Sequence, residues 1–247
     1  LDLSNSNSVK NYFKRNDPKI IFHLASVGIS REENKNRELN YQNVLMVKNI
    51  VKNIPPDCRL VISGSMAEYG GSGTFRESDI CNPITEYAKS KLAITNYCLN
   101  KDNISKDIRI CRIFGAYGFG ELGPRLFPYL LKCSKEKRTC HLSDGKQKRD
   151  FIHVIDICIC LLKIALIDKE ECKKLINIGT GKAIEVKYVV KKIAKCFEIN
   201  PQLLKFNSVD RSPGDADSIC ANVDLLGSLI NYIPPQRLQD YKDLKGL

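Results

Sequence analysis

The chain has 247 residues, and 39 Lys and Arg against 28 Asp and Glu give it a formal net charge of +11. Hydrophobic residues make up 43% of the sequence, which is enough for a sizeable core and excludes a wholly disordered chain. No apolar stretch approaches the roughly 20 residues that cross a bilayer, and the polar opening Leu1–Asn16 does not predict a signal peptide. We therefore expect a cytoplasmic protein without a membrane span.

Eleven cysteines are scattered along the chain, and no two form a CxxC pair. Zinc sites need paired ligands at short spacings, and the chain has three histidines, so we expect no metal site. A disulfide framework is not expected in a chain of this size, which predicts reduced thiols that act as small core residues. The positive charge suits an anionic partner, either nucleic acid or a small phosphorylated molecule. Because the lysines are spread along the whole chain, solvated surface is the simpler interpretation.

Apolar, β-branched runs alternate with amphipathic stretches, which predicts an α/β fold with a doubly wound parallel sheet. In chain order the pattern predicts a strand at Lys19–Leu24, a helix at Asn43–Val51, a strand at Arg59–Ser63, a helix at Thr85–Asn100, a strand at Ile108–Phe114, a helix at His153–Ile167, a strand at Leu175–Ile178 and a helix at Glu185–Phe197.

Two regions interrupt this alternation. Tyr117–Lys148 is rich in Gly, Pro and Lys, and Asn200–Leu247 contains four prolines. We assign residues 117–152 and 181–247 to a smaller lobe, and residues 1–116 and 153–180 to the main domain. A Gly-rich turn of the GxGxxG or GxxGxxG type, which brings a backbone close to a pyrophosphate, does not lie between any predicted strand and predicted helix.

Tyr87 and Lys91 stand four residues apart on a predicted helix, so their side chains share one face. Tyrosine is a poor base at neutral pH because its reference pKa is ~10, and a nearby ammonium group favours the phenolate. Ser65 follows the predicted strand that precedes this helix and opens into the same crevice. A Ser, Tyr and Lys group suits interconversion of an alcohol and a ketone, with hydride transferred to or from a nicotinamide.

Around these residues, a series of short motifs resembles the NAD-dependent epimerase/dehydratase family of extended short-chain dehydrogenase/reductases, which includes UDP-glucose 4-epimerase. In order, the motifs are Asp2-Leu3, His23-Leu24-Ala25, Asn43-Val44, Ser63–Gly70 (SGSMAEYG), Tyr87–Lys91 (YAKSK), Arg112–Gly118 (RIFGAYG), Gly145, Arg149–Asp156 (RDFIHVID), Asn177–Gly181 (NIGTG) and Arg211–Asp215 (RSPGD).

The resemblance implies a Rossmann-like fold and roles for individual residues. Tyr87 would be the acid and base, Lys91 would hold the nicotinamide ribose and tune Tyr87, and Ser65 would bind the sugar oxygen. Arg149 and Arg211 would bind the pyrophosphate of a nucleotide sugar, which guanidinium geometry suits. The further residues that the resemblance places at substrate or cofactor are Leu126 for the substrate, and Asp2, Leu3, Leu24, Ala25, Asn43 and Phe114 for NAD.

The chain also departs from the family pattern. The first strand and Gly-rich turn are absent, so roughly 50–60 residues, about two βα units, are missing relative to the family. We therefore expect this chain to hold NAD poorly, and NADP stays open as a cofactor. Gly115 stands where the family has an asparagine, which removes a polar contact expected with the substrate.

The resemblance leaves two reactions open. Family dehydratases have an Asp-Glu pair after the serine position, where this chain has Met66 and Ala67, so dehydration is disfavoured. A nucleotide-sugar 4-epimerase, which oxidises C4 transiently, and a 4-keto-6-deoxyhexose reductase both remain. A non-catalytic relative that binds RNA or protein is a third class, but the retained Ser65, Tyr87 and Lys91 disfavour it, and nucleic acid is not an expected partner. By resemblance we also expect a homodimer that serves surface polysaccharide synthesis.

Overall fold

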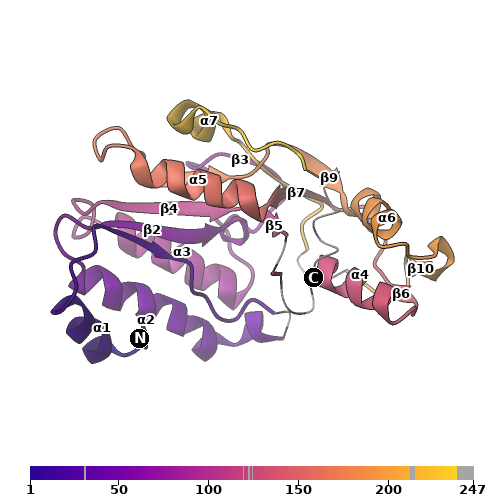
Figure 1. Cartoon of the computed structure of the whole chain (residues 1–247), viewed down its shortest axis with the longest axis horizontal. Coiled ribbons are helices and arrows are strands. Elements are labelled where there is room, and N and C mark those ends of the chain that lie inside the picture. The colour runs from indigo at the N-terminus through magenta and orange to yellow at the C-terminus, as the bar shows by residue number, and fades with distance from the viewer. Residues whose placement is uncertain (31, 119, 122, 124, 212–214, 238–247) are drawn as a thin grey trace.

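The computed structural model describes residues 1–30, 32–118, 120–121, 123, 125–211 and 215–237. Four parallel strands form the main sheet in the order β1-β2-β4-β8 (Figure 1). Their bounds are Ile20–His23 for β1, Arg59–Ser65 for β2, Ile108–Ile113 for β4 and Leu175–Ile178 for β8. The central strands are largely buried on both faces, as is typical of a parallel sheet covered by helices on both sides.

Helices cover both faces of this sheet. On one face lie α1 (Ser6–Phe13), α2 (Arg37–Asn53) and α3 (Glu86–Leu99), and on the other lie α5 (Val154–Leu166) and α7 (Asp224–Ile230) (Figure 1). Each face has its own apolar core: α2 and α3 pack against β2 and β4, while α5 and α7 pack against the opposite side of β2, β4 and β8.

A second sheet extends beyond the carboxyl end of the main one. Its strand order is β3-β11-β7-β5, and β9 pairs antiparallel with β7. The bounds are Gly73–Phe75 for β3, Ser218–Ala221 for β11, Lys148–His153 for β7, Gly115–Tyr117 for β5 and Ala183–Glu185 for β9.

The end of the molecule farthest from α1 is a small helical layer with its own core (Figure 1). It contains α4 (Leu126–Lys135), α6 (Val186–Cys196) and the two-stranded pair β6 (Cys140–His141) and β10 (Leu204–Lys205). The short 3-10 helices are η1 (Glu33–Lys35), η2 (Met66–Glu68) and η3 (Pro201–Leu203).

The predicted α/β class and parallel main sheet are confirmed, and each of the eight predicted elements is present. The largest difference is α2, which begins at Arg37 instead of Asn43. Asn36 caps this helix by accepting a hydrogen bond from the Leu39 backbone N–H at 3.0 Å. The added residues begin with the exposed, charged Arg37 and Glu38 and include one aliphatic residue, Leu39, so the apolar spacing did not reveal them.

The second sheet takes strands from both of the residue sets that the sequence divided into domain and lobe, since β3 lies within 1–116 and β11 within 181–247. The division by residue ranges therefore stays a prediction. Within Tyr117–Lys148, where no helix was predicted, the structure has α4, which forms an apolar core with the predicted helix α6.

Candidate active site

The three side chains predicted for catalysis lie at the carboxyl end of the main sheet. Ser65 is the last residue of β2, and Tyr87 and Lys91 lie in the first two turns of α3. The N-cap Thr85 accepts a hydrogen bond from the Ala88 backbone N–H at 3.1 Å through its Oγ1. This cap fixes where α3 begins, and with it the position of Tyr87.

The structure brings the three residues together. The Tyr87 hydroxyl is hydrogen-bonded to Ser65 and to Ser26, which follows β1. Lys91 is buried, and its Nζ donates to the backbone carbonyl of Ser63 at 2.9 Å. The same Nζ lies 5.7 Å from the centroid of the Tyr87 ring.

Burial dominates the titration of this group. It raises the pKa of Tyr87, and the hydrogen bonds to Ser65 and Ser26 offset part of that rise. It lowers the pKa of Lys91 to about 8, against the opposing attraction of the Glu68 carboxylate. The cost of burying both groups, which the spacing of Tyr87 and Lys91 in the sequence does not indicate, therefore sets the direction of both pKa shifts.

Glu68 is a residue that sequence reasoning did not place in the site. It is fully buried, and its Oε1 accepts a hydrogen bond from the Ser65 backbone N–H at 2.9 Å. Ser65 and Glu68 together form a capping box around η2. The Ser-x-x-Glu spacing is the sequence signal of such a box and would have identified it.

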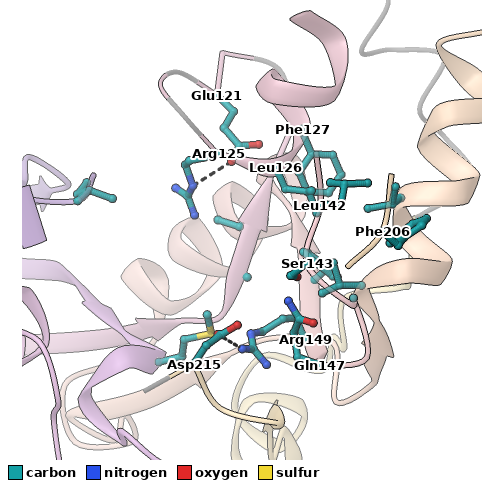
Figure 2. Close-up of a pocket in the computed structure, with 18 residues that line it drawn as sticks. Glu121, Arg125, Leu126, Phe127, Leu142, Ser143, Gln147, Arg149, Phe206 and Asp215 are labelled. Atoms are coloured by element: carbon teal, nitrogen blue, oxygen red, sulfur yellow. Dashed lines mark hydrogen bonds and ion pairs between the residues drawn. The ribbon is translucent and has the colours of Figure 1, made fainter. Parts of the chain in front are cut away.

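A cavity of about 530 Å³ opens beside these residues, between the second sheet and the helical layer (Figure 2). Met66, the residue after Ser65, is part of its wall, and so are Leu126 and Arg149, whose contact with a substrate stays a prediction. Apolar side chains from the helical layer, Val186, Val190 and Phe206, also face this space. The cavity is therefore apolar over much of its wall, with a few charged groups.

Two ion pairs provide those charges (Figure 2). Arg149 is paired with Asp215, and Arg125 lies 3.0 Å from Glu121. Burial raises the pKa of Glu121 to about 7, although Arg125 partly opposes this rise. Of these four residues, Arg149 was predicted from the sequence to contact a substrate. No local sequence pattern identifies Arg125 or Glu121, because they come together with the other lining residues only in the folded chain.

Arg211 occupies a different position from the one expected. Its guanidinium pairs with Asp144 at 2.7 Å and with Asp217 at 2.8 Å. It is not among the described residues that line the cavity. Asp215, the last residue of the RSPGD motif that begins with Arg211, lines the cavity instead.

The residues predicted to contact the dinucleotide fall into separate groups. Leu24 and Ala25 follow β1 and are exposed at the carboxyl end of the sheet. Asn43 is buried, and its side-chain amide bonds both the N–H and the carbonyl of Val27 at 2.9 and 3.0 Å. Asn43 therefore holds the loop after β1, including Ser26, with which it shares a hydrogen bond of 3.3 Å.

Phe114, Asp2 and Leu3 lie apart from that group. The Phe114 side chain is buried in a core cluster with Tyr69. Asp2 is exposed, and the Leu3 carbonyl accepts a hydrogen bond from Asn49 of α2 at 3.0 Å. Their contact with a cofactor stays a prediction.

A match between the sequence and a family model decides which family the chain belongs to. The model described as the NAD dependent epimerase/dehydratase family matches residues 1–179, well over half of the chain. The chain belongs to this family. The resemblance drawn from the motifs is thereby confirmed.

Relatives within the family have several activities. The chain is 26% identical to a UDP-glucose 4-epimerase of Corynebacterium glutamicum over 71% of this chain and 58% of that protein. It is 33% identical to an ADP-L-glycero-D-manno-heptose-6-epimerase of Alkalilimnicola ehrlichii over 50% of this chain and 42% of that protein. Among solved structures, MoeE5 in complex with UDP-glucose and NAD is 25% identical, with a TM-score of 0.78 over 96% of this chain and 78% of that one. The chain thus spans less than two thirds of the length of these two curated relatives.

Family membership raises the question of whether these residues fit NAD, the cofactor of the family. One Nζ proton of Lys91 is used by the Ser63 carbonyl, and the two others remain for ribose hydroxyls. Leu24 and Ala25 offer exposed apolar surface near the end of β1. The nicotinamide end of the cofactor therefore fits these residues.

Among the residues that the structure describes, the main sheet has no such counterpart for the pyrophosphate end. Gly118, Gly120 and Gly123 do have the spacing of a phosphate-binding turn, and they lie between β5 and α4. The sequence search missed this arrangement because it did not predict α4. However, β5 belongs to the second sheet, and Glu121 lines the cavity. Within the described residues, no turn of this spacing follows a strand of the main sheet.

Proposed function

We propose that this chain is the catalytic part of an NAD-dependent enzyme that epimerises C4 of a nucleotide sugar. The proposal is supported above all by the placement of Ser65, Tyr87 and Lys91 beside a cavity with guanidinium groups in its wall. Hydroxyls next to a buried ammonium suit proton exchange with an alcohol. A guanidinium such as that of Arg149 suits the diphosphate of the substrate.

Lys91, Leu24 and Ala25 would hold the nicotinamide end of NAD, which would supply the acceptor for a hydride from C4 and the donor that returns it. The Tyr87 oxygen takes the proton of the C4 hydroxyl as the hydride leaves, and gives a proton back when the ketone is reduced on its other face. Ser65 Oγ binds the C4 oxygen throughout, and the Lys91 ammonium stabilises the Tyr87 phenolate. Because each proton and hydride returns, the enzyme ends the cycle unchanged.

The sequence around Ser65 favours redox chemistry at C4 over loss of water. Met66 lines the cavity and Ala67 follows it, and neither side chain transfers protons. A 4,6-dehydratase needs an acid and a base at these positions, as family dehydratases have. We therefore place the reaction among the epimerases, with a 4-keto-6-deoxyhexose reductase as the second candidate.

The first experiment replaces Tyr87 by Phe in the full-length enzyme. We expect turnover of UDP-glucose and UDP-galactose to fall by at least about a hundredfold, the usual contribution of a positioned acid or base. NAD affinity should stay within about threefold. Tyr188→Phe, a change on the exposed surface of α6, is the matched control. Activity of Tyr87→Phe near that of the control would contradict the assignment.

The same assay distinguishes the two reactions through cofactor stoichiometry. An epimerase converts substrate without net change in NADH absorbance. A reductase acting on a 4-keto-6-deoxyhexose nucleotide oxidises one NAD(P)H for each substrate consumed. One-to-one consumption would replace the epimerase proposal by the reductase.

We also propose that the enzyme is a homodimer joined through α2 and α3. A surface groove between these two helices is lined by residues of both, including Tyr41, which is 50% exposed, and Val44. Isologous packing of such a face around a two-fold axis is a common way to cover it. No helix among the described residues combines the length and apolarity that a bilayer span requires; the cytoplasmic location stays a prediction.

A further inference from the structure

Glu68 is a charged side chain with no exposed surface, placed directly beneath the reactive residues. Its carboxylate has three hydrogen-bonding partners. Oε1 accepts from the Ser65 backbone N–H at 2.9 Å, and Oε2 accepts from Thr95 Oγ1 at 2.8 Å and from Arg112 Nε at 2.9 Å. A buried carboxylate is costly unless it is paired in this way.

These partners lie on different elements. Ser65 ends β2, while Thr95 lies on α3 one turn after Lys91. The carboxylate therefore connects the strand that carries the serine to the helix that carries the tyrosine and lysine. Its Oε1 also lies at the edge of the space above Gly64, where an added Cβ would come within 3.0 Å of it. The carboxylate has little freedom to move relative to β2.

Arg112 holds the other side of the carboxylate. This guanidinium comes from β4, is 2% exposed, and lies 4.6 Å from the centroid of the Tyr69 ring. Tyr69 in turn donates from its hydroxyl to Asn177 Oδ1 at 2.7 Å. The pair is thus fixed by contacts with β4 and β8 as well as β2 and α3.

We propose that Glu68 is a positioning residue of the site: it sets the place of Ser65 relative to α3 and supplies the negative charge that stabilises the Lys91 ammonium. The mechanistic part of this inference rests on the proposed function. The electrostatic part concerns the chain itself and does not depend on which sugar is bound.

The groups around Lys91 show why Glu68 has this effect. Tyr87 lies on the same helix, His23 approaches from β1, and Glu68 approaches from η2 with Arg112 behind it. Burial, with a further contribution from the Lys91 charge, lowers the pKa of His23 to about 4, so this imidazole is neutral at neutral pH. Burial lowers the pKa of Lys91 to about 8, and Glu68 is the charge that acts against this decrease.

The experiment follows the protonation of Lys91 directly, without substrate or cofactor. Lysine is labelled with ¹³C at Cε, the Lys91 signal is assigned by its loss in Lys91→Met, and its chemical shift is followed by NMR from pH 6 to 11. Glu68→Gln keeps the shape and an acceptor but removes the charge, leaving Arg112 uncompensated. We expect the Lys91 midpoint to fall by about one pH unit or more, in line with the size of such pairwise effects.

Two further variants separate charge from structure. Glu68→Gln with Arg112→Met removes both halves of the ion pair, which proteins often tolerate, and should also lower the midpoint. Thr95→Val breaks one hydrogen bond of the carboxylate but leaves its charge, so the midpoint should stay within about 0.3 units of wild type. A Lys91 midpoint that stays at the wild-type value in both folded Glu68 variants would overturn the electrostatic role.

In the full-length enzyme, the alkaline limb of the kcat profile should move to lower pH in Glu68→Gln by the same amount as the NMR midpoint. Thr95→Val should lower kcat without moving that limb. A loss of kcat in Glu68→Gln with an unmoved profile would show a merely structural role and contradict the proposal. If the enzyme turns over none of the tested sugars, the NMR titration still decides the electrostatic role.

Discussion

Asp150 shows how much one buried side chain contributes to the architecture around the site. It is fully buried, and its carboxylate accepts hydrogen bonds from the backbone N–H groups of Thr180, Gly181 and Ala221 at 2.9 to 3.1 Å, and from Thr180 Oγ1 at 2.6 Å. One carboxylate thus connects β7, the turn after β8, and β11. These backbone N–H groups donate to Asp150 and not to a carbonyl of a neighbouring strand.

We therefore expect Asp150→Asn to destabilise the chain. An amide has one acceptor oxygen and presents an NH₂ group to donors that need an acceptor, so at least one buried N–H is left without a partner. The expected loss in the free energy of unfolding is about 2–4 kcal/mol, measured by urea denaturation. Asp217→Asn, at a carboxylate with an 87% exposed side chain, is the control and should change it by less than about 0.5 kcal/mol. An equal, small effect of both changes would contradict this account of Asp150.

At the scale of single residues, the sequence points to candidate site residues that stand at a characteristic spacing or at the end of a strand. Tyr87 and Lys91 followed from a four-residue interval on a helix, and Ser65 from the end of the preceding strand. The position of Glu68 was readable as a capping box but its partner Arg112 was not, because the partner comes from a strand 44 residues away. The motif that contains Arg211 gave no indication of its ion pairs with Asp144 and Asp217, and the predicted contact of Arg211 with a pyrophosphate stays a prediction.

At the scale of elements, β4 is the informative case, because its sequence IRICRI places two arginines in a central strand. One of them, Arg112, pairs with Glu68. The other, Arg109, is 1% exposed and donates to the carbonyls of Ile164 and Ile167 at the end of α5. A charged side chain in a buried strand therefore caps a helix that packs across the sheet.

Arg109→Met should show this capping role. It removes the donors from the last carbonyls of α5 and one partner of Asp107, which keeps Arg59. We expect a loss of about 2–4 kcal/mol in the free energy of unfolding and faster hydrogen exchange in the last turn of α5. Arg109→Lys supplies a single ammonium and should lose roughly half as much. Identical stability of Arg109→Met and wild type would exclude the capping role.

The longer strands and helices were predictable because the spacing of their apolar residues matches the sides that are buried when helices cover both faces of a sheet. The short strands β3, β5, β9 and β11 were not, since each has only three or four residues and no clear apolar run. The helix α4 was missed because the glycines and prolines before it dominate the local composition, while its apolar residues Phe127, Leu130 and Cys133 pack into a core that forms only with α6.

At the scale of the whole molecule, the edge strand β1 and the outer face of α5 both expose apolar side chains. The strand β1 is an edge of the main sheet, with Ile20 and Phe22 39% and 38% exposed. The outer face of α5 exposes Ile155, Leu162 and Leu166 by 53%, 56% and 74%. In doubly wound sheets such surfaces are where further strands and helices pack. Among the described residues no phosphate-binding turn follows a strand of the main sheet, and we propose that the described part of the site binds the nicotinamide end of the cofactor.

That assignment predicts how this 247-residue chain distinguishes two ligands. If its residues hold the nicotinamide ribose but not the rest of the dinucleotide, nicotinamide mononucleotide and NAD should bind with dissociation constants within about tenfold of each other, a difference of about 1.4 kcal/mol. Both should be weak, and both should weaken further in Lys91→Met, as measured by isothermal titration calorimetry. In a complete dinucleotide site the adenosine diphosphate half adds contacts at a phosphate-binding turn and raises the affinity for NAD far above that for the mononucleotide. NAD binding more than a hundredfold tighter than the mononucleotide would therefore show that this chain forms an adenosine and pyrophosphate site from residues other than those named here.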